Sequence, residues 1–487
     1  MGVEKKVLVI GAGSVAGPTV EYLSRDNDVK VADLDQGNLG KLEGSVSQYR
    51  DGKPHSHTSL HKGFFAGDPE MLREVDAADV VVSLVDWVYH APIADACIST
   101  GTPLVTASYS HSLSSDATTK LIEGITGAST EQAKQAGMRV LEQRAIEAGV
   151  PLFMENGVDP GLDHMSAMKL FADAEAKGGK VISFESDCGC LPSANNEAKT
   201  PFGYQFSWSP TAVLLAAKSD AQYLASGQVV KVAEGRIFEQ EHVRHVKVPG
   251  VDATFERYLN RDSLPYIETY DLDGVVNFSR RTLRNQGWCE TLLAINKLGL
   301  LEKEGESSET YFGLLSTLAG YSGTDVGDLK KAVADKVGIS HDSEVLERLD
   351  YIGLFSNEAI PEGKPREAPL YALADLMQTK LPYAEGETDM IVMQHRVQAD
   401  YHGCNVGNDT RQQTDSTLVY HGDPEGFSAI AVTTGLQAAF ATEHVLNGGL
   451  EGKSGIIIPT DKEFCEFALD KFEQEAGITF QEQTYEI

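Results

Sequence analysis

A short glycine-containing stretch near the start of the chain has the residue types and spacing that bind a dinucleotide. Gly11, Gly13 and Ala16 fit the pattern G-x-G-x-x-G/A between an apolar run and a helix-like stretch, and Asp33 lies in the next strand-like run. The first glycine of this pattern permits a tight turn, and the second lets the backbone approach a pyrophosphate. The helix that follows offers free N–H groups and the positive end of its dipole to that anion. The pattern therefore predicts a dinucleotide site.

Asp33 also bears on which dinucleotide is bound. A carboxylate at this position accepts a hydrogen bond from the 2′-hydroxyl of the adenosine ribose and repels a 2′-phosphate. Asp35 adds a second negative charge, and no arginine follows immediately. These residues predict a preference for NAD(H). NADP(H) stays open as the alternative, because Lys41 is close enough in sequence to reach a phosphate.

A second group of polar residues occupies positions 155–165, ENGVDPGLDHM. Asp159 suits the N-cap of a helix and Pro160 its first position, and apolar residues recur at helical spacing beyond them. We expect the helix to begin here, at the carboxyl end of a strand at 151–155, where open α/β sheets bind ligands. A well-formed helix start without any ligand explains the same residues equally simply.

The elements that must position these residues alternate between strand and helix over the first 110 residues, which predicts a parallel, doubly wound sheet. A helical pattern follows, then a mixed α/β region, a helix-rich region and a final helix and strand. The expected strands are 6–10, 29–35, 78–85, 103–109, 151–155, 180–189, 236–248, 388–395 and 455–459, and the expected helical stretches include 121–150, much of 291–380 and 426–449.

Composition narrows the class of protein. The 487 residues contain 41% hydrophobic and 23% charged residues, as in globular proteins, and the length corresponds to about three domains. The net charge of −31 argues against nucleic acid and against an anionic membrane surface as partners. No apolar run is long enough to span a membrane, so we expect a cytoplasmic protein.

Cysteine and histidine spacing predicts neither disulfide bonds nor a metal site. The six cysteines are scattered and form no disulfide framework or zinc pattern. His55, His57 and His61 lie close in sequence, but they lack an acidic or cysteine partner at zinc-binding spacing. We therefore expect reduced thiols and no metal.

Several long blocks resemble the saccharopine dehydrogenase family, in particular its L-glutamate-forming type. The resemblance covers essentially the whole chain. It is carried by 83–91 (SLVDWVYHA), 106–109 (TASY), 155–165, 187–196 (DCGCLPSANN), 201–210 (PFGYQFSWSP), 258–270 (YLNRDSLPYIETY), 281–290 (RTLRNQGWCE) and 421–435 (HGDPEGFSAIAVTTG).

The resemblance implies an α/β fold of three parts and a homodimer. A Rossmann dinucleotide-binding domain is expected at 1–130, rejoined at about 422–460; a mixed α/β substrate and dimerisation domain at 131–290, rejoined at about 385–421; and an all-helical domain at 291–384. The implied reaction belongs to lysine metabolism. L-2-aminoadipate 6-semialdehyde and L-glutamate form an imine, which a nicotinamide hydride reduces to saccharopine, and the reverse oxidation releases glutamate.

The resemblance also implies site residues. The implied cofactor-binding residues are Gly11, Gly13, Ser14, Val15, Ala16, Asp33, Ser83, Leu84 and Val85. The implied substrate-binding residues are Ser108, Tyr109, Asp159, Gly189, Trp208, Arg261, Arg281, Thr282 and Arg284. Saccharopine carries three carboxylates, and a guanidinium grips a carboxylate bidentately, so the arginines suit this substrate.

The acid/base residue is left open among several side chains. Asp159, Tyr109 and Cys188 are the expected catalytic residues, with Asp163 and His164 as further candidates; a buried structural role for His164 is equally compatible with its position. Two departures from the family pattern, Asp86 in place of a frequent proline and ADLD at 32–35, bear on the cofactor choice. A carboxyspermidine-type dehydrogenase and a non-catalytic dinucleotide-sensing protein are the alternative functions.

Overall fold

The chain forms two compact units in a computed structural model. The structure describes residues 4–46, 56–59, 69–110, 116–194, 196, 200–305, 308–401 and 410–487, so His55 and His61 lie outside the described residues. Unit 1 comprises Met1–Ala172 and Glu425–Thr479, and unit 2 comprises Asp173–Pro424 and Phe480–Ile487. The predicted helical domain, 291–384, is part of unit 2, and the separate three-domain division stays a prediction.

Unit 1 contains a seven-stranded sheet in which every pair of neighbouring strands is parallel. The strand order is β15-β6-β5-β4-β1-β2-β3, so the chain starts in the middle of the sheet and the order reverses between β1 and β4. This confirms the predicted doubly wound sheet, which binds ligands beyond the carboxyl ends of its strands near such a reversal. The strands are β1 Lys6–Ile10, β2 Asp28–Asp33, β3 Ser56–Ser59, β4 Val80–Ser83, β5 Leu104–Thr106, β6 Pro151–Phe153 and β15 Gly455–Ile457.

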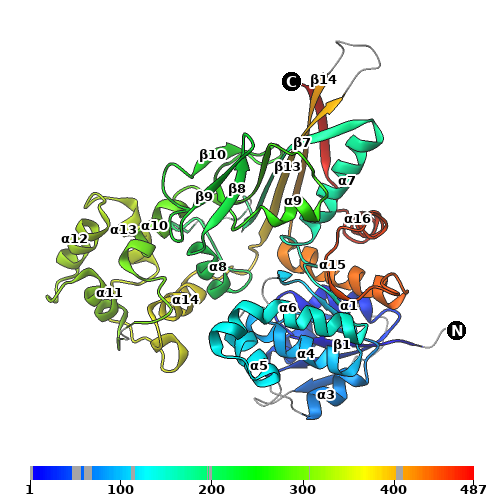
Figure 1. The fold of residues 1–487 in the computed structure, drawn as a ribbon. Helices are drawn as coiled ribbons and strands as arrows, with labels where there is room; N and C mark the ends of the chain where they lie inside the picture. The colour runs from blue at the N-terminus through cyan, green and yellow to red at the C-terminus, as the bar shows by residue number, and fades with distance from the viewer. Residues whose placement is uncertain are drawn as a thin grey trace. The chain divides into compact units, whose positions relative to one another are not determined.

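Helices surround this sheet, and the C-terminal helices belong to the same unit (Figure 1). They are α1 Ala16–Leu23, α2 Gln36–Val46, α3 Pro69–Asp76, the 3-10 turn η2 Trp87–Tyr89, α4 His90–Thr100, α5 Asp116–Thr126, α6 Thr130–Ala148, α15 Ala429–Leu446 and α16 Lys462–Ala476. The stretch expected to be helical over 121–150 is helical and contains a break between α5 and α6. Gly127 has a φ of 68°, and Ser129 forms a capping box with Gln132, so one helix stops and the next is capped.

Unit 2 is built on a mixed sheet of nine strands with the path β10-β11-β12-β7-β13-β14-β16, to which β8 and β9 attach through β12. The β12–β7 pair is parallel and the other pairs are antiparallel. The strands are β7 Gly179–Pro192, β8 Ala221–Ala225, β9 Gln228–Val232, β10 Arg244–Lys247, β11 Thr254–Leu259, β12 Asn277–Asn285, β13 Asp389–Tyr401, β14 Thr410–His421 and β16 Gln481–Glu486.

The strand expected over 236–248 is wrong for its first half. Only β10 at Arg244–Lys247 is extended there, and the preceding residues form turns. Arg236 donates two hydrogen bonds through Nε and one through Nη2 to the carboxylate of Glu239, a local contact that favours a turn over a strand.

The helices of unit 2 gather mainly at one end of its sheet, where α10 to α14 lie together (Figure 1). One apolar cluster joins these helices, including Trp288 of α10, to Tyr258 of β11 and to Tyr204. Among the described residues no helix is both long and apolar enough to cross a membrane. The helices are α7 Leu162–Ala176, which crosses the unit boundary, α8 Pro210–Ala217, α9 Pro265–Thr269, α10 Trp288–Leu298, α11 Tyr311–Ala319, α12 Val326–Val337, α13 Glu344–Tyr351, the 3-10 turn η4 Lys364–Arg366 and α14 Pro369–Lys380.

Candidate active site

The glycine turn after β1 has the geometry that a dinucleotide requires. Gly11 has a φ of 106°, and a Cβ atom there would lie 2.9 Å from the carbonyl carbon of Leu84. A Cβ atom on Gly13 would meet nothing within 4 Å, so the backbone is open to a ligand at this point. Val15 at the N-cap of α1 provides no capping side chain. The turn therefore leaves both space and first-turn N–H groups for a pyrophosphate.

Asp33 is hydrogen-bonded to the same turn. Its Oδ2 accepts a hydrogen bond of 2.7 Å from the backbone N–H of Ala12, and its Oδ1 accepts one of 2.7 Å from the N–H of Asp35. The carboxylate is only partly exposed, so its orientation is fixed before any ligand arrives. Ser14 and Ala16 lie in the turn and at the start of α1. The predicted residues of the glycine motif are thus brought together with Asp33.

The ends of β4 and β5 complete this edge of unit 1. Ser83 is buried at the end of β4, and the backbone of Leu84 packs against Gly11, with Val85 next to it. Ser108 lies two residues beyond the end of β5. Because β4 lies between β1 and β5 in a parallel sheet, their carboxyl ends share one edge, and the predicted cofactor and substrate residues of unit 1 lie along it.

Asp159 faces Tyr109 and does not cap the helix. The Tyr109 hydroxyl donates a 2.7 Å hydrogen bond to Oδ1 of Asp159. The predicted N-cap is wrong, because α7 begins only at Leu162. The intervening loop closes on itself, since the N–H of Gly157 donates to the carbonyl of Pro160 at 2.9 Å. Two of the expected catalytic side chains thus face each other.

Glu155 and His164 form a buried pair beneath this loop. Nε2 of His164 lies 2.8 Å from Oε2 of Glu155, and both side chains are almost wholly buried. The other carboxylate oxygen, Oε1, accepts a 2.9 Å hydrogen bond from the N–H of Ser110. Burial raises the pKa of Glu155, but the hydrogen bond and charge of His164 and the Ser110 contact outweigh it and lower the pKa to about 2. This geometry favours the structural role for His164, and it makes Glu155 the anchor of the Tyr109 loop.

In unit 2 the predicted substrate residues of β12 lie on opposite faces of the sheet. Side chains alternate along a strand, so Arg281 faces away from Thr282 and Arg284. The parallel register pairs Arg281 with Asp187 and Thr282 with Cys188. Cys188 therefore shares the face of Thr282 and Arg284, and Arg281 is not brought together with them.

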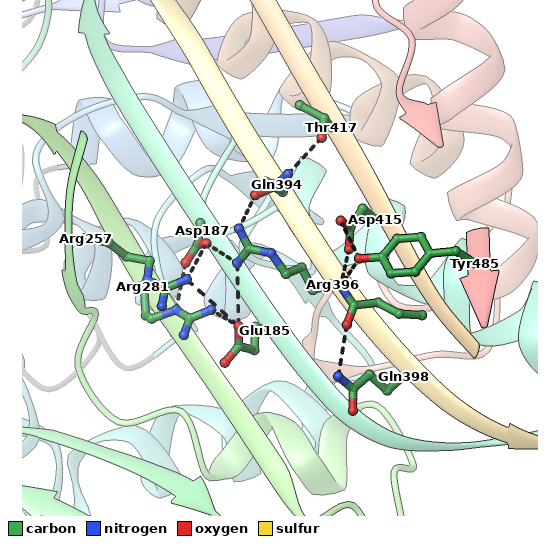
Figure 2. A network of polar contacts seen from close by, with 11 residues as sticks. Glu185, Asp187, Arg257, Arg281, Gln394, Arg396, Gln398, Asp415, Thr417 and Tyr485 are labelled. Atoms are coloured by element: carbon green, nitrogen blue, oxygen red, sulfur yellow. Dashed lines mark hydrogen bonds and ion pairs between the residues drawn. The ribbon is translucent and has the colours of Figure 1, made fainter. Parts of the chain in front are cut away.

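Arg281 belongs to a network of buried and partly buried ion pairs (Figure 2). Its Nε lies 2.7 Å from Oδ1 of Asp187, and its Nη2 lies 2.6 Å from Oε2 of Glu185. Nη1 of Arg396 and Nη1 of Arg257 also approach Oδ2 of Asp187, at 3.0 and 3.3 Å. Burial raises the pKa of Asp187, which is 0% exposed, but the three arginines outweigh it and lower the pKa. Arg281 is thus neutralised within the sheet.

A cavity of about 170 Å³ opens on this same face. Its lining includes Arg257 and Arg281, whose charges are already balanced by Glu185 and Asp187. Because these arginines already have acidic partners, the cavity does not strongly favour the binding of an anionic ligand.

Arg284 has the opposite surroundings. The residue is 6% exposed, its Nη1 donates to the carbonyl of Leu283 at 2.8 Å, and its Nε has no hydrogen-bond partner. The guanidinium stacks over the rings of Tyr204 at 5.1 Å and Trp288 at 5.5 Å. Within the described part of the chain, no carboxylate forms an ion pair with it. A buried cation without an anion is costly, so this position favours a negatively charged ligand.

The other predicted residues of unit 2 differ in their surroundings. Nε1 of Trp208 donates to the Tyr204 hydroxyl at 3.3 Å, which links Trp208 to the ring beneath Arg284. Gly189 is required for packing, because a Cβ atom there would lie 2.9 Å from Cβ of Leu283. Arg261 follows β11 with a φ of 55° and is half-buried. The predicted residues of unit 2 therefore include contacts to the Arg284 environment and purely structural positions.

Sequence reasoning missed polar groups around Arg284. Cys190 lies 3.5 Å from Oδ2 of Asp389 and 3.6 Å from the Ser207 hydroxyl. Burial raises the pKa of the Cys190 thiol, so it stays protonated near neutral pH. The hydroxyl of Tyr383 is buried without a hydrogen-bond partner. Cys190 is two residues beyond Cys188, so strand alternation was the signal that could have placed it on the same face.

One group in the described residues has the spacing of metal ligands. Donor atoms of Glu239, Glu241 and His242 lie within 4.8 Å of one another. Arg236 already forms ion pairs with both glutamates, and such partly exposed acidic groups occur commonly without a metal. This group therefore carries no argument for a metal centre.

Comparison with known proteins gives one consistent family. Residues 7–151 match the model described as Saccharopine dehydrogenase NADP binding domain, and residues 157–478 match Saccharopine dehydrogenase C-terminal domain. The chain is 30% identical to saccharopine dehydrogenase [NADP(+), L-glutamate-forming] of Schizosaccharomyces pombe, with 98% of each chain covered. It is 34% identical to the mitochondrial alpha-aminoadipic semialdehyde synthase of Mus musculus over 99% of this chain, but it spans only about half of that relative, 48% of its length.

A solved structure agrees with these matches. The apo histidine-tagged saccharopine dehydrogenase (L-Glu forming) from Saccharomyces cerevisiae superimposes with a TM-score of 0.78 and 28% identity, covering 99% of this chain and 100% of that chain. The predicted fold class is thereby confirmed over the whole chain.

Proposed function

Because the chain belongs to the saccharopine dehydrogenase family, we propose that it is a nicotinamide-dependent oxidoreductase of lysine metabolism that interconverts saccharopine with L-glutamate and L-2-aminoadipate 6-semialdehyde. In the reductive direction the glutamate amine and the aldehyde lose water to form an imine. A nicotinamide cofactor supplies or accepts the hydride when it is bound. The homodimer and the cytoplasmic location are parts of the same proposal.

The observation that carries the proposal is the environment of Arg284. Saccharopine has three carboxylates, and a chain with a net charge of −31 repels such a ligand unless local cations hold it. Arg284 is buried, rests on two aromatic rings and has no acidic partner in the described residues. A substrate carboxylate would supply the missing anion in a bidentate contact. Arg261 is proposed as a second clamp, and Arg281 is not, because acids already neutralise it.

Residues of unit 1 are proposed to hold the cofactor and the reacting amine. The backbone around Gly11 and Gly13 would hold the pyrophosphate at the start of α1. Asp159 would accept a hydrogen bond from the substrate amine, and the Tyr109 hydroxyl would keep that carboxylate in place. Asp159 can also take up and return a proton at the amine nitrogen.

Cysteine and tryptophan side chains of unit 2 are proposed to shape the substrate environment. Cys188 is a further candidate for proton transfer, and Thr282 can donate a hydrogen bond from the same sheet face. Trp208, tied to Tyr204, would supply an apolar wall that excludes water.

We further propose that NAD(H) is the preferred cofactor of this chain, although the yeast relatives are named for NADP(+). Asp33 is held against the glycine turn by hydrogen bonds from the N–H groups of Ala12 and Asp35, and its negative charge would repel a 2′-phosphate at this turn. Steady-state kinetics with both cofactors test this. A higher kcat/KM with NADP(H) would contradict the proposed preference for NAD(H) but would leave the proposed reaction unaffected.

The reaction itself is tested by absorbance at the nicotinamide band with saccharopine and oxidised cofactor. We expect saccharopine-dependent reduction of the cofactor and release of L-glutamate. Turnover of carboxyspermidine and not saccharopine would favour the related dehydrogenase. Cofactor binding without turnover of either compound would instead favour a dinucleotide-sensing protein.

A further inference from the structure

His90, the first residue of α4, is a buried histidine to which none of the foregoing roles applies. Its side chain is 0% exposed. Nε2 lies 2.6 Å from the hydroxyl oxygen of Ser108. Nδ1 lies 3.0 Å from the hydroxyl oxygen of Ser83 and 3.4 Å from that of Thr106. Both ring nitrogens therefore contact groups from the ends of two neighbouring strands, β4 and β5.

The ring is a neutral imidazole at physiological pH. Burial lowers the pKa of His90 to about 4, against a smaller opposite effect of the Val85 backbone. A neutral imidazole has one donor and one acceptor nitrogen. If Nδ1 carries the proton, Nε2 accepts a hydrogen bond from the Ser108 hydroxyl, and if Nε2 carries it, Nε2 donates one. In either tautomer the contact holds the Ser108 hydroxyl in position.

We propose that His90 is a positioning residue, which holds the Ser108 hydroxyl for the substrate and ties it to the β4 end that carries the cofactor residues Ser83 to Val85. The inference rests on the proposed function, because Ser108 is a substrate residue only in that function. An apolar side chain could fill the same buried space without the desolvation cost of an imidazole, so its two hydrogen-bonded nitrogens point to a polar role.

Two amide variants separate this role from packing. The amide of His90→Gln can reach the place of Nε2 and retain a hydrogen bond to Ser108, whereas the shorter amide of His90→Asn can reach only the place of Nδ1. We expect His90→Asn to raise KM for saccharopine and to lower kcat/KM about tenfold or more, the loss of one buried hydrogen bond. His90→Gln should recover most of that loss. The Kd of reduced cofactor, measured by fluorescence, should change less than about twofold in both variants.

His444→Asn is the matched control for lost packing. His444 also lies in unit 1 and is half-buried, but it packs against Phe153 and Phe464 and not against a predicted site residue. Its variant should lose thermal stability without a change in KM for saccharopine. If His90→Asn behaves like this control, or if the glutamine variant is no better than the asparagine variant, His90 only packs and the inference is overturned.

A measurement that does not depend on enzymatic activity can test this inference separately from the proposed function. Nitrogen-15 NMR of the histidine rings should show a neutral His90 ring above pH 6, and Ser108→Ala should shift its Nε2 resonance. An unchanged resonance would mean that His90 does not contact Ser108, and the inference would be wrong. Absence of saccharopine-dependent activity in the wild-type protein, with the NMR contact intact, would instead contradict the function.

Discussion

Arg281 and Arg284 lie on the same strand, β12, and differ in what their charges meet. Arg281 faces Asp187 and Glu185, with two more arginines around the same acids (Figure 2). Arg284 contacts aromatic rings and a backbone carbonyl and lies near cysteine thiols. Its cross-strand neighbour Glu256 accepts hydrogen bonds from the N–H groups of Gly287 and Cys289, and no carboxylate of the described residues forms an ion pair with Arg284. A buried charge whose counter-ion is built into the fold supports structure, whereas a buried charge that lacks one is suited to a ligand. From this difference we infer that Arg281 stabilises the sheet and that Arg284 binds the substrate.

The largest expected effect comes from removing the shared acid of the network. Asp187→Asn would leave Arg281, Arg257 and Arg396 close together, with Glu185 still paired with each of them. We expect the free energy of unfolding to fall by about 3–5 kcal/mol, the range for breaking a buried ion pair. Denaturant unfolding measures it. If KM for saccharopine rises while the unfolding free energy stays the same, Asp187 serves substrate and the comparison fails.

The Glu155–His164 pair in unit 1 is a second buried ion pair, and its contribution to the stability of the fold should depend on pH. The Glu155 carboxylate has its pKa lowered from 4.5 to about 2, so it stabilises the fold above pH 4.5 and that contribution is lost as pH falls through 2. Glu155→Gln should cost about 3 kcal/mol at pH 7 because it removes the nearer of two carboxylates beside His164, whose Nδ1 also lies 3.7 Å from Oδ1 of Asp163. The gap in Tm between wild type and variant should narrow as pH falls from 5 to 2. A gap that stays constant would mean that the charge of Glu155 is not what stabilises the pair.

Arg284→Met should separate binding from stability. The variant keeps an unbranched apolar stem but loses the cation, so kcat/KM for saccharopine should fall about 30-fold or more, equivalent to about 2 kcal/mol. The unfolding free energy without substrate should stay the same or rise, because replacing an unpaired buried charge with an apolar group is often stabilising. A marked loss of stability with normal kinetics would show that Arg284 is structural.

The Asp159 and Tyr109 pair predicts an effect on activity with little effect on folding. Asp159→Asn keeps an oxygen that can accept the Tyr109 hydrogen bond but removes the charge and the proton-exchanging group. We expect kcat/KM to fall about tenfold or more, with Tm close to wild type. Tyr109→Phe is the matched variant and should reduce activity less, because the carboxylate is retained. Near wild-type activity in Asp159→Asn would remove Asp159 from the mechanism.

The smallest effect is expected at Arg281. Arg281→Lys retains the charge near Asp187 but loses the forked contacts, so the unfolding free energy should fall by about 1–2 kcal/mol. KM for saccharopine should change by less than about twofold. A large rise in KM here would contradict the assignment of this arginine to the sheet.

Local sequence patterns were sufficient for much of unit 1. The strand at 6–10, the glycine turn and the acid at position 33 depend on neighbouring residues, and the structure places them as expected. The N-cap at Asp159 could not be read in this way, because the loop folds back through a contact between Gly157 and Pro160 that moves the helix start. His90 carried no local signal either, since Ser83 and Ser108 meet it only through the order of strands in the sheet.

The arginines of β12 are a different case, because the signal was present. Two residues three apart on a strand face opposite sides, so the sequence already separates Arg281 from Arg284 once the strand is recognised. What the sequence could not supply was the chemistry on each face. Asp187 comes from β7, and Tyr204 comes from the segment before α8, so the partners of the two arginines depend on the fold.

The most direct test of the assignment is the change in Tm on adding saturating saccharopine, with cofactor present, in the wild type, Arg284→Met and Arg281→Lys. A ligand that binds the native state raises the unfolding free energy by RT ln(1 + [L]/Kd), so the shift reports affinity even in variants of different initial stability. We predict a clear rise in Tm for the wild type and for Arg281→Lys, and little or no rise for Arg284→Met. The reverse pattern, with the shift lost in Arg281→Lys and retained in Arg284→Met, would contradict the account.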